Sequence, residues 1–255
     1  MKNPPTIITH EMGLESNPLP AWTDDGSAIT FDAAPNEAVL RVEIPEVPGA
    51  FQLINVLNSN EADEFVEQAE RLGFHQDSPV SLPYHIRHNN NLNWVVSEKI
   101  DHTIWQRCHE FVPEIVDEQK AMGLNARFRF YRYGEGDFFK THRDGAWPGS
   151  RVISGKLIND AYPGCYSQFT CLIFLNDDYQ GGRTQFLVSK TDDRQPAQFS
   201  EDVELVSVKT PKGAVLCFPH GSHPQHCLHG GESISKGKKY IIRTDILFSN
   251  QEQTQ

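Results

Sequence analysis

The sequence predicts a mainly β-stranded fold with α-helices in its N-terminal half. Residues 127–133 alternate between a face of Phe residues and a face of Arg and Tyr residues, which is the period of a β-strand. Further strand-like apolar runs cover residues 168–176, 215–219 and 239–248. Apolar residues at helical spacing occur earlier, between residues 58 and 113. A chain of 255 residues can bury the core of one or two units, and one β domain with helical additions fits this length.

The first 48 residues differ in composition from the rest of the chain. They are rich in Pro, Asn, Asp and Glu, and their apolar stretches, such as residues 38–42, are brief. We therefore expect residues 1–48 to form an irregular leader that contributes at most an edge strand. The main domain is then residues 49–255, with helical support over 58–120 and a β core over 126–249.

Two helices are expected in the supporting region. Asn58 or Ser59 can cap the first helix by accepting a hydrogen bond from its backbone, and Gly73 can end it. Apolar residues between these positions recur at helical spacing and predict a buried face. The second helix begins near Ser97 and is interrupted or redirected at Pro113, because proline lacks the backbone N–H that continues a helix.

A candidate metal site begins at the end of the stretch 133–145. His142 and Asp144 are separated by one residue, so on an extended segment their side chains point the same way. An imidazole and a carboxylate on one face can bind a divalent metal, although such a pair is most often a surface pair. A metal site therefore needs a third ligand from elsewhere in the chain, as in a 2-His-1-carboxylate arrangement.

The third ligand is expected among four histidines spaced three residues apart, namely His220, His223, His226 and His229. Most of them are expected to lie in a polar, partly exposed loop. His229 differs because a strand-like run, beginning with Lys239, follows it. A ligand at the start of a strand, with a cation further along, can hold a metal and one end of a dicarboxylate together.

Taken in order, these motifs resemble the prolyl-4-hydroxylase branch of the iron(II)/2-oxoglutarate-dependent dioxygenases. The resemblance covers about residues 51–248 and rests on Tyr133, Gly134, Gly136, His142 and Asp144, then Gly181, Gly182, Thr184 and Phe186, then His229, Gly231 and Lys239. Each motif alone has low specificity, whereas all of them in this order and spacing form a specific signal. Arg183 departs from the pattern, because relatives often have Glu there.

The resemblance implies a double-stranded β-helix, or jelly roll, with the N-terminal helices packed outside it. It implies that His142, Asp144 and His229 bind Fe(II), and that the chain uses 2-oxoglutarate, O2 and, as a further cofactor, ascorbate. The implied reaction hydroxylates an aliphatic C–H bond while 2-oxoglutarate is decarboxylated to succinate. By the same resemblance Tyr133 and Thr170 lie at the co-substrate, and no catalytic residue is expected beyond the metal ligands.

Two cations compete for the distal carboxylate of 2-oxoglutarate. Lys239 and Arg243 share a strand face but lie roughly 13 Å apart at about 3.3 Å per residue, so one compact carboxylate cannot be anchored equally by both. The spacing from His229 and the family pattern favour Lys239. Arg243 is then the second choice, or a buried partner for an acidic residue such as Asp245.

Two candidate substrate contacts, Arg87 and Asn91, come from residues 79–93, a polar connection rich in Asn. One interpretation is a loop at the mouth of the active site, where Arg87 and an Asn contact polar groups of the substrate. The other is a solvated loop in which the amides form turns.

Three further candidates follow in the chain. Arg129 and Tyr131 share the strand face of Tyr133, which in relatives points into the cavity; the alternative is a polar outer face. Trp147 lies in residues 145–168, a long stretch that is either an aromatic-bearing lid or a simple hairpin.

The composition limits the cellular compartments and binding partners that we expect for this protein. The net charge of −11, from 23 basic and 34 acidic residues, does not favour tight binding to nucleic acid. The five cysteines are an odd number without framework spacing, which suits a reducing compartment. The N-terminus lacks an apolar signal core, and no stretch approaches the roughly 18 apolar residues of a membrane span. We therefore expect a cytoplasmic protein without membrane or nucleic-acid partners.

The sequence leaves the substrate open. A prolyl or other side chain in a peptide or protein is the leading hypothesis by resemblance, and a small molecule is the alternative within the superfamily. A non-catalytic, cupin-like metal-binding or sensor protein would use the same barrel but gives no reason for Lys239 at its spacing. A nucleic-acid demethylase conflicts with the acidic charge. A zinc site of cysteines and histidines is the weakest hypothesis, because no Cys-x-x-Cys pair is present.

Overall fold

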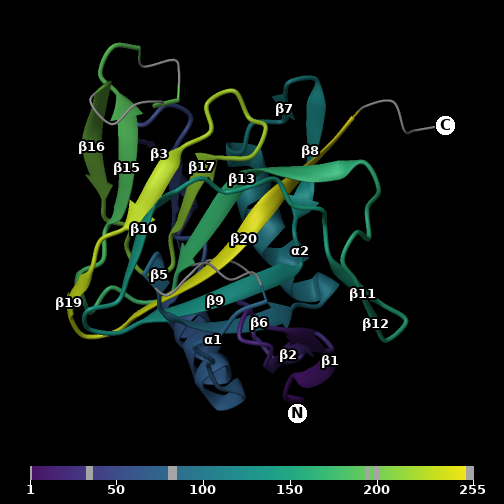
Figure 1. The fold of residues 1–255 in the computed structure, drawn as a ribbon. Coiled ribbons are helices and arrows are strands. Elements are labelled where there is room, and N and C mark those ends of the chain that lie inside the picture. The colour runs from purple at the N-terminus through teal and green to yellow at the C-terminus, as the bar shows by residue number, and fades with distance from the viewer. Residues whose placement is uncertain (1, 33–36, 80–84, 193–195, 198–201, 251–255) are drawn as a thin grey trace.

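The computed structural model describes residues 2–32, 37–79, 85–192, 196–197 and 202–250 (Figure 1). The helices are α1 (Ser59–Leu72) and α2 (Glu98–Cys108), and a short 3-10 helix, His109–Phe111, follows α2. The strands up to the second helix are β1 (Thr6–Met12), β2 (Pro18–Thr23), β3 (Leu40–Glu43), β4 (Phe51–Ile54), β5 (Arg87–His88) and β6 (Asn90–Val95). The later strands are β7 (Ile115–Val116), β8 (Gln119–Leu124), β9 (Arg127–Tyr133), β10 (Phe138–His142), β11 (Arg151–Ile153), β12 (Lys156–Ile158), β13 (Cys165–Phe174), β14 (Gln180–Gly181), β15 (Thr184–Ser189), β16 (Val203–Val208), β17 (Val215–Pro219), β18 (Leu228–Gly231), β19 (Ile234–Lys236) and β20 (Lys239–Asn250).

Most of these strands form the two sheets of a jelly roll. The larger sheet has the order β1-β2-β6-β9-β20-β13-β17-β4-β3, with β8 also paired to β20 and β7 to β8. The smaller sheet has the order β16-β15-β18-β10-β5. In Figure 1, β10, β15 and β16 lie to one side of the long strands β13 and β20 of the larger sheet. The predicted fold class, mainly β with N-terminal helices, is confirmed.

The larger sheet packs its outer face against both helices. Phe65 of α1 and Ile104 of α2 belong to the same buried apolar cluster as Phe130 of β9. The ring of Phe65 lies 6.2 Å from that of Phe130 and 6.3 Å from that of Trp94, measured between centroids. Removal of this apolar surface from water is the main force that holds the helices on the sheet.

The first helix begins and ends where the sequence predicts. Asn58 accepts a hydrogen bond from the backbone N–H of Glu61, and the Glu61 side chain accepts one from the backbone N–H of Asn58, which forms a capping box. Gly73 ends the helix with a φ of 88°, a conformation that glycine adopts without strain. Neither helix of the described residues has the length and apolar character needed to cross a membrane.

A second apolar cluster fills the space between the two sheets. The alternation in β9 places Phe128 and Phe130 in the cluster under the helices, and it places Tyr131 and Tyr133 in the cluster between the sheets. Phe186, from the smaller sheet, belongs to this inner cluster as well. The period of two therefore puts the Tyr face of β9 inside the jelly roll and excludes the polar outer face that was its alternative.

The expectation of an irregular leader is wrong for residues 6–23, whereas the edge strand that it allowed is present as β3. β1 and β2 form an antiparallel hairpin, and β2 pairs in parallel with β6, so this N-terminal hairpin extends one end of the larger sheet. β3 pairs with β4 at the opposite end, as an edge strand. Local sequence does not predict β2, because Pro18 and Pro20 lower its strand propensity. Its pairing with distant strands stabilises it instead.

Residues 145–168 contain the hairpin that the sequence offered as one of two alternatives. β11 pairs with β12 around Ser154 and Gly155, whose φ angles of 49° and 71° form the tight turn. The segment before this hairpin runs back to the larger sheet, where the backbone N–H of Trp147 donates to the hydroxyl of Ser167 at 2.8 Å.

One buried ion pair connects the two helices, and we expect its loss to destabilise the fold. Arg107 of α2 donates to both carboxylate oxygens of Glu61 at 2.7 and 2.8 Å, and the two side chains are 8% and 2% exposed. Arg107→Met leaves the Glu61 carboxylate buried without its cation, which should lower the free energy of unfolding by about 3 kcal/mol in urea denaturation. Lys120→Met, at the exposed pair with Glu114, is the control and should cost less than about 1 kcal/mol. Equal losses would show that the buried pair contributes no more than a surface pair.

Candidate functional site

The smaller sheet places two histidines opposite one another. β10 and β18 are antiparallel, and their register pairs His142 with His229. The strands come this close because Gly230 has no side chain: a Cβ atom there would lie 2.8 Å from the carbonyl oxygen of Phe139. The glycine next to His229 therefore allows the close strand pairing that places the two imidazoles side by side.

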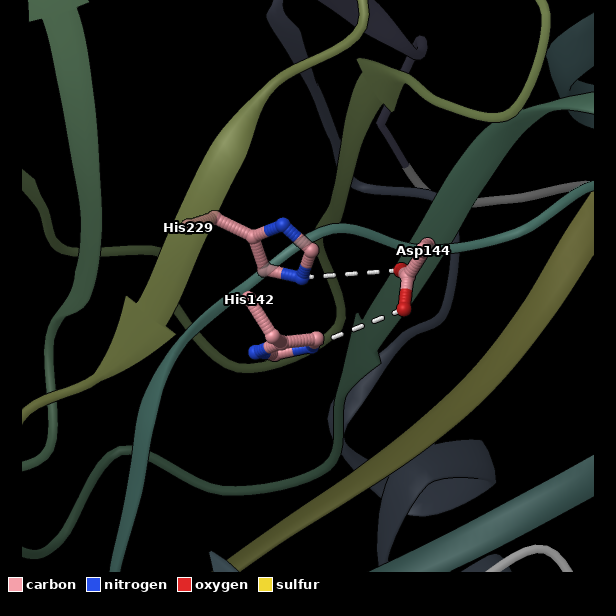
Figure 2. Close-up of side chains that lie close together, drawn as sticks. All are labelled: His142, Asp144 and His229. Atoms are coloured by element: carbon pink, nitrogen blue, oxygen red, sulfur yellow. Dashed lines mark ion pairs between the residues drawn. The ribbon is translucent and has the colours of Figure 1, made fainter. Parts of the chain in front are cut away.

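Asp144, just after β10, completes a group of three side chains that we call the triad. Nε2 of His142 lies 3.5 Å from Oδ1 of Asp144, and Nε2 of His229 lies 3.5 Å from Oδ2 of the same carboxylate (Figure 2). One donor atom from each of the three residues lies within 4.8 Å of the other two. Figure 2 shows both rings pointing at the carboxylate from the same side. The structure thus brings together the three residues that the sequence singled out.

The hydrogen bonds of the two rings leave both Nε2 atoms free to bind a metal. Nδ1–H of His142 donates to the carbonyl oxygen of Lys140 at 2.9 Å, and Nδ1–H of His229 donates to that of Cys227 at 3.4 Å. A carbonyl oxygen can only accept, so each Nδ1 carries the proton and each Nε2 keeps its lone pair. Nε2 of His142 is buried and has no hydrogen-bond partner among the described residues. This donor set fits a divalent metal held by two histidines and one carboxylate.

The ionisation of the triad also suits metal binding. Burial lowers the pKa of His229 to about 3, so its imidazole is neutral at neutral pH. Burial alone would raise the pKa of Asp144, but Arg243 and His229 beside it hold this pKa well below its ordinary value. Neutral imidazole and ionised carboxylate are the forms that bind metal ions.

A buried chain of hydrogen-bonded side chains, formed by Thr170, His220 and Ser167, supports the Asp144 carboxylate. The hydroxyl of Thr170 donates to Oδ2 of Asp144 at 2.7 Å, and Nδ1–H of His220 donates to the same hydroxyl oxygen at 2.6 Å. The hydroxyl of Ser167 in turn donates to Nε2 of His220 at 2.8 Å. Thr170 was expected next to the co-substrate, and the structure shows that its hydroxyl hydrogen-bonds the Asp144 carboxylate. The roles of Ser167 and His220 carried no signal in the sequence.

Arg243 lies on the other side of Asp144. Its Nη1 is 3.3 Å from Oδ1 of Asp144, and its Nη2 is 3.2 Å from Oδ1 of Asp245. A second guanidinium, that of Arg129, is 3.4 Å from Oδ2 of Asp245. The structure agrees with the alternative in which Arg243 is the partner of Asp245. Its contact with Asp144 could not be read from the sequence, because it joins different strands.

Lys239 lines the same cavity as the triad, which we call the triad cavity. Its ammonium group donates to the carbonyl oxygen of Gly182 at 2.6 Å and lies 5.0 and 5.7 Å from the ring centres of Phe174 and Tyr133. It forms no ion pair with any residue that the structure describes. Burial lowers the pKa of Lys239 to about 7. A buried amine without an acidic partner can bind a carboxylate of a ligand.

The other histidines of the His-rich loop stand apart from the triad. His220 supports Thr170, the ring of His223 packs edge-on against Phe169 with centroids 5.0 Å apart, and Nδ1 of His226 hydrogen-bonds the carbonyl oxygen of His223. The five cysteines are buried free thiols. Among the described residues, the triad is the one group of His, Cys, Asp or Glu side chains placed to hold a metal, so the zinc hypothesis has no support there.

A second cavity, of about 250 Å³, adjoins the triad cavity, and Tyr131 lines both. We call it the hairpin cavity because the N-terminal hairpin forms one of its walls. Its lining includes four of the five residues expected near the substrate, namely Asn91, Arg129, Tyr131 and Trp147. The fifth, Arg87, lies in β5, with its guanidinium carbon 5.3 Å from the centre of the Tyr131 ring. The sequence did not indicate Glu11, which also lines this cavity, because it lies in the presumed leader.

Comparison with protein families gives one match for this region. Residues 128–244 match the family model described as the 2OG-Fe(II) oxygenase superfamily. This range contains the triad, Lys239 and Arg243. A comparison with curated proteins gives no match.

Comparison with solved structures gives several similar chains. A prolyl hydroxylase from Trichoplax adhaerens, solved with a peptide fragment of the hypoxia-inducible factor, has a TM-score of 0.52 at 16% identity, over 81% of this chain and 88% of that one. A viral collagen prolyl hydroxylase from Paramecium Bursaria Chlorella virus-1, solved with 2-oxoglutarate, has a TM-score of 0.49 at 17% identity, over 81% and 99%. HygX from Streptomyces hygroscopicus, solved with nickel, 2-oxoglutarate and hygromycin B, has a TM-score of 0.46 at 13% identity, over 81% and 84%.

We expect a divalent metal to stabilise the folded chain through the triad. Mn(II) added to metal-free protein at 100 times its dissociation constant should raise the free energy of unfolding by about 2.7 kcal/mol, because the unfolded chain has no assembled site. Thermal unfolding with and without Mn(II) measures this gain. His229→Ala should lose it, whereas His226→Ala, in the same loop but outside the triad, should keep it. A full gain in His229→Ala would contradict metal binding by the triad.

Proposed function

We propose a reaction for this chain from the premise that it is an iron(II)/2-oxoglutarate-dependent dioxygenase, with its 2OG-Fe(II) oxygenase domain at residues 128–244. The reaction is hydroxylation of an aliphatic C–H bond, coupled to decarboxylation of 2-oxoglutarate to succinate. The observation that carries the proposal is the placement in one cavity of the triad and a buried lysine that forms no ion pair with the described residues.

We assign Fe(II) to Nε2 of His142, Nε2 of His229 and the carboxylate of Asp144. Two histidines and one carboxylate leave further positions of the metal open for a co-substrate. When bound, the iron supplies the oxidising chemistry together with 2-oxoglutarate and O2, and ascorbate is a typical additional cofactor of the superfamily.

We assign the distal carboxylate of 2-oxoglutarate to Lys239. Arg243 already pairs with Asp144 and Asp245, whereas Lys239 has no acidic partner among the described residues. This difference supports Lys239, which the spacing from His229 already favoured, over Arg243. Tyr133, which lines the same cavity, then lies at the co-substrate.

The residues of the chain orient the reactants and exclude water. Thr170 and Arg243 hold the Asp144 carboxylate from two sides, which fixes its position relative to the imidazoles. The ring of Phe139 stacks on that of His142 with centroids 3.7 Å apart and covers it with an apolar surface. Such fixed, water-poor surroundings lower the cost of aligning a substrate C–H bond with the metal.

For the substrate we propose a prolyl or other aliphatic side chain in a peptide or protein. The fold similarity to the prolyl hydroxylase solved with a peptide supports this choice. A small molecule is the second candidate, and the hairpin cavity next to the triad favours it, because a volume of about 250 Å³ suits a compact ligand.

Anaerobic titration of metal-free protein with Fe(II) and 2-oxoglutarate tests the proposed function. The wild type should develop the visible charge-transfer band of the iron–2-oxoglutarate chelate, and in air it should form succinate. His142→Ala should lose both signals, because it removes one metal ligand, whereas His226→Ala should keep both. Tight metal binding by the wild type without the band would overturn the 2-oxoglutarate assignment and favour a metal-binding barrel.

The affinity for 2-oxoglutarate should fall with rising pH through Lys239. Its pKa of about 7 means that the free protein loses this proton above neutral pH, so a dicarboxylate must restore it on binding. The dissociation constant of 2-oxoglutarate should then rise by up to about tenfold per pH unit between about pH 7 and 9. Lys239→Arg keeps its charge over this range and should show a flat profile. A flat profile in the wild type would contradict the assignment of Lys239.

A further inference from the structure

The hairpin cavity lies on the sheet face that also carries the co-substrate residues. β6 and β9 pair so that Asn91 stands opposite Tyr131 and Asn93 opposite Arg129, and all four side chains line the cavity. Tyr133, two residues beyond Tyr131 on the same strand face, lines the triad cavity. A molecule in the hairpin cavity would therefore extend along one continuous surface toward the triad.

The walls of the hairpin cavity are largely apolar. Leu19 and Pro20 come from the N-terminal hairpin, and Trp147 and Pro148 come from the segment that follows the triad. The volume of about 250 Å³ is below the roughly 300 Å³ at which typical ligand pockets begin, so the cavity suits a compact molecule.

Two arginines line the hairpin cavity, and they differ in how many of their N–H donors form hydrogen bonds within the protein. Arg127 is engaged by the side chains of three neighbours, at 2.9 Å from Glu11, 3.1 Å from Ser150 and 2.6 Å from Asn159. Arg129 makes one hydrogen bond to the described residues, a long one of 3.4 Å to Asp245. Its guanidinium carbon lies 5.1 Å from the centre of the Trp147 ring, and its side chain is 12% exposed. Arg129 thus has N–H donors left for a ligand.

Metal binding would change the balance of charge around Arg129. Arg243 pairs with both Asp144 and Asp245, whereas Arg129 pairs with Asp245 alone. When Asp144 binds a divalent cation, its negative charge is committed to that cation. Two guanidinium groups then share the one remaining carboxylate of this cluster, Asp245. A further anionic group at Arg129 would restore neutrality in a buried place, where an unbalanced charge is costly.

We propose that the hairpin cavity binds the molecule that is oxidised, and that this substrate is a compact, largely apolar carboxylic acid whose carboxylate pairs with Arg129. The proposal rests on the proposed hydroxylation and narrows its second substrate candidate, a small molecule, in place of a peptide side chain. A guanidinium group binds a carboxylate through two parallel hydrogen bonds, which also fixes its orientation. The rings of Trp147 and Tyr131 provide the apolar surface against which the rest of the molecule packs.

Binding without turnover tests this proposal. The protein is loaded with Mn(II) and saturating 2-oxoglutarate, which occupies Lys239, and probes are titrated by calorimetry. The first pair of probes is cyclohexanecarboxylate and cyclohexanecarboxamide, which share shape but differ in charge. The second pair is acetyl-Ala-Ala-Pro with a free C-terminus and the same peptide as its amide, so that a peptide terminus is distinguished from a small acid.

The wild type should bind cyclohexanecarboxylate at least tenfold more tightly than the amide. Arg129→Met should abolish this preference, and Arg132→Met should retain it, because Arg132 lies on the opposite face of β9 and pairs with Glu70 at the surface. If Arg129→Met does not fold, the affinities of the wild type for cyclohexanecarboxylate and its amide still test the proposal.

Equal affinity for the small acid and its amide would overturn the proposal, as would a preference for the acid in the peptide pair alone. These failures are separate from failure of the proposed function, which is read from the chelate band of the Fe(II) protein. A normal band together with no acid preference would reject the substrate class and leave the oxygenase assignment intact.

Discussion

The antiparallel pairing of β10 with β18 is the constraint on which the site depends. It sets His142 opposite His229, and a register slip of one residue would turn one imidazole to the other face of the sheet. Gly230 allows this pairing, because a side chain there would meet the backbone of β10. Once the two histidines are placed, Asp144 follows from its spacing on the chain, two residues after His142. The metal donors are therefore positioned mainly by the backbone.

The surroundings of Asp144 show how the fold keeps charges buried. Burying a carboxylate in a low-dielectric interior is costly unless cations or hydrogen-bond donors compensate it. Thr170 donates to Asp144 on one side and Arg243 pairs with it on the other. Lys239 is the contrasting case, since it is buried with a carbonyl oxygen and aromatic rings and forms no ion pair with the residues that the structure describes. A cavity in which the charge of Asp144 is compensated and the charge of Lys239 is not is suited to binding an anionic ligand at Lys239.

The sequence predicted the parts of the structure that depend on local periodicity and on motif spacing. The α1 bounds follow from a helix cap, and the shared strand face of Tyr131 and Tyr133 follows from the period of two. The inward direction of that face and the choice of the three triad residues also needed the resemblance to the dioxygenases. Contacts between distant segments were not predictable in this way. The N-terminal hairpin, the bond from Thr170 to Asp144 and the pair of Arg243 with Asp144 form only when strands far apart in sequence meet.

The N-terminal hairpin illustrates why such long-range contacts matter for specificity. Glu11 of β1 accepts hydrogen bonds from Arg127 of β9 and from Asn93 of β6, so one carboxylate holds two polar side chains of the hairpin cavity. The ion pair of Glu11 with Arg127 compensates the charge of one of the two cavity arginines. Arg129 is then the cation of the hairpin cavity whose N–H groups can still bind a ligand. A segment that looks like an irregular leader in the sequence thereby determines which guanidinium of the hairpin cavity faces a ligand.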